Sequence, residues 1–220
     1  MATRLLLADL ADLAGRAHGI EVRFESGGGV EIARRVREGA VVDVLVLADD
    51  AMRKLEAEGQ LASGSVRPLF VSQVVAAVAD GAPRPALDSE DDLRAALVAA
   101  TKVAYSTGPS GTALVDLVSR WGLDDEVGPK LVQAPPGVPV GTFLAEGNAD
   151  LAFQQRSELA NVPGVVVLGP LPGEAAITSV FSGGVIATSA QPDASRQLLD
   201  LLASEEAAAT VEAHGMHPAP

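Results

Sequence analysis

The sequence predicts an α/β fold in which helices cover both faces of mostly parallel sheets. Two observations support this prediction. Along the 220 residues, apolar or alternating runs typical of strands are separated by segments with the spacing of amphipathic helices. Because 48% of the residues are hydrophobic, the chain can also build a core for one large domain or two small ones.

The elements expected first are a helix with leucines at helical spacing, from Leu5 to Leu13, and a strand over residues 20–26 that ends on glycines. A short amphipathic helix over 30–39 is closed by a glycine. The near-continuous apolar run 41–50 predicts a strand buried on both faces, and 51–61 predicts the helix after it.

The middle of the chain continues the alternation. A long strand is expected over 69–80, and a helix over 89–100 has Ser89 as its cap. The remaining elements are predicted as strands over 102–106, 129–134, 150–155 and 176–188, helices over 112–122, 140–147, 193–204 and 205–215, and a turn over 135–139.

Charge and composition exclude several classes of function. The chain has 16 Lys and Arg against 29 Asp and Glu, a formal net charge of -13, and only 3% aromatic residues. A nucleic-acid partner is therefore not expected, because phosphates need basic groups and bases need aromatic platforms. With no cysteine and with His18, His214 and His217 near chain or helix ends, neither a metal site nor a cofactor is expected.

The amino-terminal residues do not read as a secretory signal, because acidic residues interrupt the leucines of "LLLADLADLAG". No run of 18 apolar residues occurs in the sequence, so no membrane span is expected. As written, the chain is expected to be cytoplasmic.

Polar clusters of small residues follow several of the predicted strands. The most informative is "YSTGPSGTAL", Tyr105–Leu114, which reads as a strand end, a tight loop and a helix start. Helix starts bind anions because their first N–H groups have no partner within the helix. An alternative is that Ser110 only caps the helix. The nucleotide-binding patterns are absent, since no lysine follows Gly111 and no G-x-G-x-x-G occurs.

The order of the motifs resembles the type II periplasmic binding proteins of the molybdate-binding kind, which are receptors of ABC transporters. The motifs are F-x-S-G-G-G, then ARR-x-x-x-G-x-x-x-D-V-x-V-L-A-D, G-P-S-G-T before a helix ending in WGL, G-V-P-V-G-x-x-x-A-x-G-x-A-D-L-A, and SEL. The resemblance covers the chain from Ala2 to about Met216. It implies a small anionic ligand and, as a further partner, an ABC transporter permease.

The resemblance also implies two lobes joined by a hinge of two crossing strands, near Phe70–Val78 and Ile177–Ile186. The second lobe is expected at residues 80–174, and the first lobe at residues 1–79 together with 175–220.

Ligand contacts can be carried over from the family residue by residue. The first-lobe loop corresponds to Ser26, Gly27 and Gly28, where glycines replace much of the hydroxyl content, and Val138 corresponds to a loop that offers a backbone N–H. Gln154 or Gln155 stands where the molybdate binders have a tyrosine. The candidate set in the second lobe is completed by Ser106, Thr107, Ser110, Gly111 and Ser157.

The amino terminus departs from the family, whose members begin with a strand before the first helix. Either this chain has lost the strand, or Met1 is an internal methionine taken as the start. In the second case Thr3 and Arg4 stand at the first-lobe anion site, Arg4 being able to pair with a carboxylate or simply to be a solvated arginine. A periplasmic or extracellular location is then expected, and the first lobe is expected to show a gap, or an unusual direct pairing, where the strand belongs.

Two classes of function remain open, with a ligand-sensing regulatory module as a weaker third. The first is a binding protein for a small anion, a carboxylate in preference to molybdate because a glutamine amide both donates and accepts. The second is an enzyme on the same scaffold, similar to aconitate isomerase, with Glu158 as the candidate base or, alternatively, as a surface or capping carboxylate.

Overall fold

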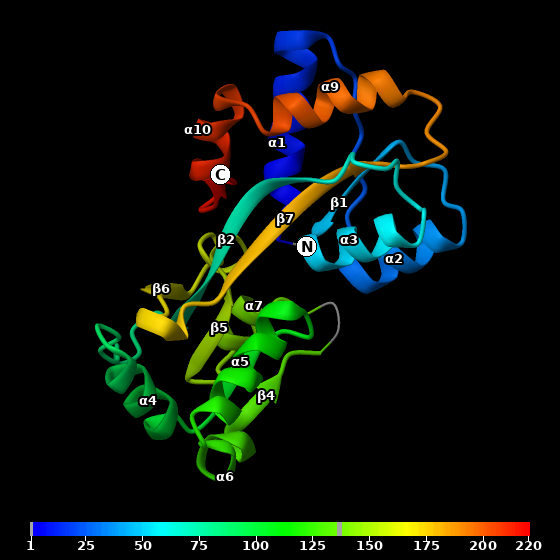
Figure 1. The fold of residues 1–220 in the computed structure, drawn as a ribbon. Helices are drawn as coiled ribbons and strands as arrows, with labels where there is room; N and C mark the ends of the chain where they lie inside the picture. Colours follow the sequence, from blue (N-terminus) through cyan, green and yellow to red (C-terminus); the bar gives the residue numbers. More distant parts are fainter. Residues whose placement is uncertain (1, 136–137) are drawn as a thin grey trace. The chain divides into compact units, whose positions relative to one another are not determined.

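The computed structural model describes residues 2–135 and 138–220, in which the chain forms two compact units. Unit 1 consists of Met1–Ser72 and Val180–Pro220, and unit 2 is the continuous segment Gln73–Ser179. The chain passes from one unit to the other twice, once within strand β2 (Arg67–Ala79) and once within strand β7 (Thr178–Val185) (Figure 1).

Unit 1 is built from both ends of the chain. Besides its parts of β2 and β7, its elements are α1 (Arg4–His18), α2 (Gly29–Arg37), β1 (Val44–Ala48), α3 (Asp49–Ala57), α9 (Pro192–Leu202), α10 (Glu205–Ala213) and β8 (His217–Pro218). β1 pairs antiparallel with β7, from Val44 opposite Val185 to Ala48 opposite Phe181, and β8 pairs with the start of β2.

Helices cover both faces of β1. Its residues Leu45 and Leu47 belong to a hydrophobic cluster with α2 and α3, whereas Val44 and Val46 pack against a second cluster built by α1, α9 and α10. This division follows from the strand geometry, because successive side chains point to opposite faces.

Two of the three histidines lie where α1 meets α10. The Nε2 atom of His18 is 2.9 Å from Glu206 Oε2, and that of His214 is 2.7 Å from Asp9 Oδ2. Each pair joins a residue of α1 to one in or directly after α10, so these two imidazoles contribute to helix packing.

Unit 2 contains most of the helix starts that sequence analysis singled out. Its elements are α4 (Glu90–Ala99), β3 (Val103–Tyr105), α5 (Pro109–Arg120), α6 (Asp124–Val127), η1 (Gly128–Lys130), β4 (Leu131–Gln133), α7 (Val140–Ala145), β5 (Leu151–Gln155), α8 (Arg156–Leu159), β6 (Val165–Pro170) and η2 (Gly173–Ala175).

The sheet of unit 2 is mixed. β3 lies between β4 and β5 and is parallel to both, whereas β2 pairs antiparallel with β5 and with β6. Leu151 and Phe153 of β5 belong to the cluster under α4 and α5, and Ala152 belongs to the cluster with α7 on the other face.

The α/β fold predicted from the sequence is confirmed. Among the described residues, parallel pairing is limited to β3 with its two neighbours, and the long strands β2 and β7 run antiparallel to the strands they pair with. The helix cap at Ser89 is also confirmed, as a capping box in which the Ser89 hydroxyl accepts from the Asp92 N–H at 3.1 Å and the Asp92 carboxylate accepts from the Ser89 N–H at 3.0 Å.

The strand predicted over residues 20–26 is wrong: Ile20–Ser26 belongs to no sheet. Its apolar side chains Ile20, Val22 and Phe24 still pack against the cluster of α1, α9 and α10. The segment thus keeps the alternation of a strand and lacks the hydrogen-bonded neighbour that would make it one.

The strand predicted over 41–50 is shorter than expected. β1 covers only Val44–Ala48, and α3 already begins at Asp49. Leu45 and Leu47, on one face of β1, are buried, whereas the residues on the other face are only partly buried. The predicted burial on both faces is therefore confirmed for one face only.

None of the helices in the described part of the chain combines the length and the apolar character that a membrane crossing requires.

Candidate functional site

The candidate residues of unit 2 lie where three parallel strands end. In the ladder, Tyr105 of β3 is level with Phe153 of β5 and with Gln133 of β4. The next residues, Ser106, Gln154 and Ala134, therefore follow at the same carboxyl edge of the sheet. In α/β folds this edge is where ligands bind.

The loop between β3 and α5 is held by its own hydroxyl groups. The Oγ atoms of Ser106 and Ser110 are 3.1 Å apart, and the Gly108 N–H donates to Ser106 Oγ at 3.3 Å. The residue that caps α5 is Gly108, and Ser110 is the second residue of the helix. The alternative in which Ser110 is the cap is therefore wrong, and Ser110 is a buried residue of the first helical turn, only 5% exposed.

Gly111 allows this loop to close on the helix. A Cβ atom at this position would lie 1.9 Å from the Ser106 carbonyl oxygen and 2.8 Å from Cδ2 of Tyr105. The Gly111 N–H donates to the Gly108 carbonyl at 3.0 Å, so the described contacts of Gly111 are those of a packing residue. Thr107, in the same loop, is exposed.

The second loop of this edge lies between β4 and α7. Val138 is exposed, and its N–H, which the family pattern offers to a ligand, donates to the Pro135 carbonyl at 2.9 Å. Pro136 and Gly137, from the turn predicted over 135–139, lie outside the described residues.

The third loop starts with two buried amides. Gln154 and Gln155 are 5% and 4% exposed, and as neighbours in β5 they point to opposite faces of the sheet. The Gln155 Nε2 donates to Ser179 Oγ at 2.7 Å. Within residues 2–135 and 138–220, the Oε1 atoms of both glutamines have no hydrogen-bond partner. A buried polar atom in this state is costly unless a ligand or water meets it.

Glu158 shares the surroundings of Gln154. Burial raises the pKa of the Glu158 carboxyl above its ordinary value of 4.5, and a hydrogen bond with the Gln154 side chain opposes that shift. Ser157, directly before it, has a buried Oγ atom without a partner in the described part of the chain. The carboxyl is therefore a titratable group at this edge, on the third residue of α8, whose N-cap is Gln155.

Glu158→Gln is expected to stabilise the folded protein at neutral pH. Because the folded-state pKa is raised, the stability that the proton on Glu158 provides is complete below about pH 4.5 and is lost as the pH rises through the folded-state pKa. Glutamine cannot ionise, so urea denaturation between about pH 4 and about pH 8 should show a flatter pH dependence for the variant. Glu146→Gln, at an exposed position after α7, is the control and should keep the dependence of the unmodified chain. Identical pH dependences for Glu158→Gln and the unmodified chain would contradict the assignment.

The candidate residues of unit 1 lie at two helix starts. Gly28 is the N-cap of α2, with Ser26 exposed before it and Gly27 packed close to the Ile32 side chain. Thr3 is the N-cap of α1 and is 9% exposed, while Arg4 opens the helix and is exposed. These residues lie at the amino ends of α1 and α2, and the amino end of a helix favours negative charge.

Ser179 is a contact that sequence reasoning missed. Ser179 lies in β7, 24 residues after Gln155, and its hydroxyl accepts a hydrogen bond from the Gln155 amide. It lay inside a predicted apolar strand, and no spacing pattern pointed to it.

Almost the whole chain matches the sequence of a known family. The profile of the family described as bacterial extracellular solute-binding protein matches residues 1–217, so the chain belongs to this family.

Two relatives and one solved structure show which kinds of protein this chain is similar to. Aconitate isomerase from Pseudomonas sp. is 37% identical over 190 residues, which are 86% of this chain and 72% of that protein. Molybdate-binding protein ModA of Azotobacter vinelandii is 26% identical over 219 residues, 94% of this chain and 84% of that protein. The structure of the Azotobacter vinelandii periplasmic molybdate-binding protein superposes with a TM-score of 0.78 at 21% identity, covering 98% of this chain and 95% of that one. The resemblance to the molybdate-binding kind is thereby confirmed, and with it the role of a solute-binding protein.

Proposed function

We propose that the solute is a small carboxylate anion, held in unit 2 at the carboxyl edge of β3, β4 and β5. The single observation that supports this choice is the buried amide oxygen of Gln154, which lacks a partner among the described residues. Gln154 stands near the carboxyl end of β5, at the same edge as the Ser106 and Ser110 hydroxyls and the start of α5, which favour negative charge.

The amide of Gln154 favours a ligand that carries both hydrogen-bond donors and acceptors. A fully ionised tetrahedral oxyanion only accepts hydrogen bonds, so it would leave the buried amide oxygen of Gln154 unsatisfied. A hydroxy acid or a partly protonated polycarboxylate carries both acceptors and an O–H donor, and it can satisfy both kinds of group. The raised pKa of Glu158 acts in the same direction, because a protonated carboxyl can donate to a ligand carboxylate.

Membership of the family supports delivery of the solute to a membrane transporter. The partner proposed for the loaded protein is the permease of an ABC transporter, and the place of action is outside the cytoplasmic membrane, as the family description indicates. Overall charge does not favour the ligand, since a net charge of -13 slows the approach of an anion.

Titration calorimetry against molybdate, sulfate, citrate and both aconitate isomers is expected to show the tightest binding for a carboxylate. Ser110→Ala should weaken that binding by roughly 1 kcal/mol or more, because a charged ligand group loses its donor. Ser119→Ala, near the other end of the same helix, is the matched control and should leave affinity unchanged. Tight molybdate binding without carboxylate binding would reject the proposed ligand.

An isomerase is the second candidate. It is favoured by the 37% identity to aconitate isomerase and by the position of Glu158 beside Gln154, which gives the edge a potential general base. Incubation of the protein with one aconitate isomer, followed by NMR of the mixture, separates the candidates: only an enzyme produces the other isomer.

A further inference from the structure

Gln155 and Ser179 form a buried polar pair that the carboxylate of a ligand does not account for. The Gln155 side chain is 4% exposed, and its Nε2 donates to Ser179 Oγ at 2.7 Å. Ser179 lies near the start of β7 and is itself partly buried. Both residues belong to unit 2, so the pair is complete within one unit.

The amide of Gln155 is satisfied at only one end. Within residues 2–135 and 138–220, its Oε1 atom is buried and has no hydrogen-bond partner. In the same part of the chain, the Ser179 hydroxyl accepts from the amide, and no group takes a hydrogen bond from it. Because a hydroxyl has one donor besides its lone pairs, the two neighbouring side chains present a free acceptor and a free donor.

Gln155 lies on the same face of the sheet as the start of α5. Side chains two residues apart in a strand share a face, so Gln155 is on the face of Phe153, which packs in the cluster under α4 and α5. The hydroxyls of Ser106 and Ser110 are at the start of α5. A ligand that lies beyond the strand ends and meets this helix start is therefore within reach of the pair.

A hydroxyl group matches the pair better than an ionised carboxylate does. A ligand hydroxyl can donate to the Gln155 oxygen and accept from the Ser179 hydroxyl. An ionised carboxylate has no donor, so it would leave the Gln155 oxygen unpaired. A buried acceptor without a donor is costly, and the pair should therefore select against ligands that lack one.

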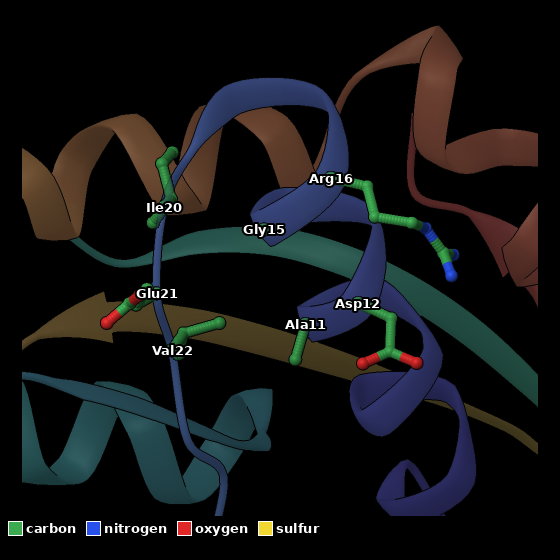
Figure 2. Close-up of a pocket in the computed structure, with 7 residues that line it drawn as sticks. All are labelled: Ala11, Asp12, Gly15, Arg16, Ile20, Glu21 and Val22. Atoms are coloured by element: carbon green, nitrogen blue, oxygen red, sulfur yellow. The ribbon is translucent and has the colours of Figure 1, made fainter.

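The hollow beside α1 in unit 1 is a poor alternative place for an anion. It measures about 360 Å³ and lies between the helix and the segment Ile20–Val22, with Val22 pointing toward Ala11 (Figure 2). The charged side chains that line it are two carboxylates and one guanidinium, those of Asp12, Glu21 and Arg16. The excess of negative charge disfavours an anionic ligand there.

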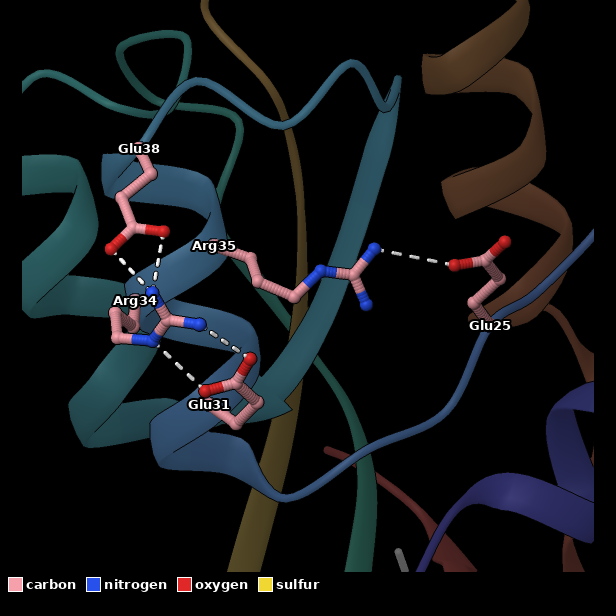
Figure 3. Close-up of polar contacts among 5 residues, drawn as sticks. All are labelled: Glu25, Glu31, Arg34, Arg35 and Glu38. Carbon is pink, nitrogen blue, oxygen red and sulfur yellow. Dashed lines mark hydrogen bonds and ion pairs between the residues drawn. The ribbon is translucent and has the colours of Figure 1, made fainter.

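The arginines of α2, whose start carries the candidate residues of unit 1, are engaged by carboxylates. Arg34 lies between Glu31 and Glu38 and is bonded to both, and Arg35 extends to Glu25 (Figure 3). These guanidinium groups are therefore not free cations for a ligand. Selection among anions should depend on hydrogen bonds at the strand ends of unit 2.

We propose that Gln155 and Ser179 recognise a hydroxyl group of the ligand, so that the solute is a hydroxy acid and not a plain carboxylate. This inference rests on the proposed carboxylate site at the carboxyl edge of β3, β4 and β5. The Gln155 oxygen accepts from the ligand hydroxyl. Ser179 holds the amide nitrogen, which keeps the amide oxygen turned toward the ligand.

The test compares ligands that differ by one hydroxyl group. Citrate is a tricarboxylate with a hydroxyl, and tricarballylate is the same tricarboxylate without it. In titration calorimetry, citrate should bind the chain at least about tenfold more tightly, because tricarballylate leaves the buried Gln155 oxygen without a donor. Aconitate also lacks the hydroxyl and should share the weaker binding.

Substitutions in the pair should change this preference and not only the affinity. Gln155→Met keeps the length of the side chain and removes the acceptor, so citrate and tricarballylate should bind equally. Ser179→Ala frees the amide to turn and should lower the preference for citrate, whereas Ser179→Thr keeps a hydroxyl and should retain it. Thr178→Ala, at the exposed neighbouring position, is the matched control and should leave both affinities unchanged. A purely structural role would weaken both ligands alike.

The outcomes separate this inference from the proposed function. Equal affinities for citrate and tricarballylate in the unmodified chain would overturn hydroxyl recognition and leave the carboxylate site in place. If both affinities also fell together between about pH 5 and about pH 8, the donor would be a protonated carboxyl of the ligand instead. A preference for citrate that survives Gln155→Met would reject the pair as its cause. If neither tricarboxylate binds, the proposed ligand class fails, and hydroxyl recognition fails with it.

Discussion

Gly111→Ala is expected to cause the largest loss of stability among single substitutions where the β3–α5 loop meets the first turn of α5. The added methyl group would lie 1.9 Å from the Ser106 carbonyl oxygen, and this neighbour is backbone, which cannot rotate away. Overpacking of this kind typically costs about 1–3 kcal/mol and occasionally more, and the absence of a flexible neighbour places this case at the upper end. Urea denaturation should show the loss as a lower midpoint.

Gly128→Ala is the matched control, because Gly128 has ordinary helical φ and ψ angles and a Cβ there meets nothing within 4 Å. It should be neutral or slightly stabilising. Because the Ser106 and Ser110 hydroxyls are brought together by the same close approach, Gly111→Ala should also weaken carboxylate binding in calorimetry. A variant as stable as the unmodified chain would show that the loop does not close on α5 as described.

Glu158→Gln is expected to have the largest effect on activity if the protein isomerises aconitate. The reaction takes a proton from a carbon next to a carboxylate and returns one to the far carbon of the shifted double bond, and a carboxylate with a raised pKa is a stronger base for the first step. Loss of a general base typically lowers the rate by about 10²–10⁴-fold. Initial rates of isomer interconversion, followed by NMR, provide the measurement.

A binding measurement separates a catalytic role of Glu158 from a role in holding the ligand. Glutamine preserves the size of Glu158, so calorimetry should find aconitate still bound by the variant that no longer turns it over. Glu146→Gln should retain the full rate, as expected for an exposed carboxylate away from the strand ends. Full turnover by Glu158→Gln would place the base elsewhere, and absence of turnover in the unmodified chain would leave solute binding as the function.

Sequence patterns predicted the elements of unit 2 better than those of unit 1. In unit 2, local signals agree with the tertiary contacts: Ser89 closes a capping box, and the polar run after Tyr105 becomes the tight start of α5. In unit 1, the alternation of residues 20–26 was strong enough to predict a strand, but a strand also requires a hydrogen-bonded neighbour. That requirement depends on residues far away in the sequence, which no local pattern reports.

The candidate site, too, could be predicted from the sequence only in part. The residue types at the strand ends could be predicted, because parallel strands bring their carboxyl ends to one edge. The directions of their side chains could not: Gln154 and Gln155 point to opposite faces, and the N–H of Val138 is used within its own turn. The environment of Glu158 is likewise a tertiary property, since its burial raises its pKa and nothing in the run "QQRSE" indicates burial.

The division of the chain affects the order in which its parts can form during synthesis. Unit 2 is one continuous segment, so all of its residues are available once Ser179 has left the ribosome. β1 is made early, but its ladder partner β7 ends at Val185, more than half the chain length later. Closing so long a loop carries an entropic cost, and until then β1 exposes both of its edges to other chains. The aromatic-poor, highly acidic composition of the chain opposes such contacts, because mutual repulsion keeps nascent copies apart.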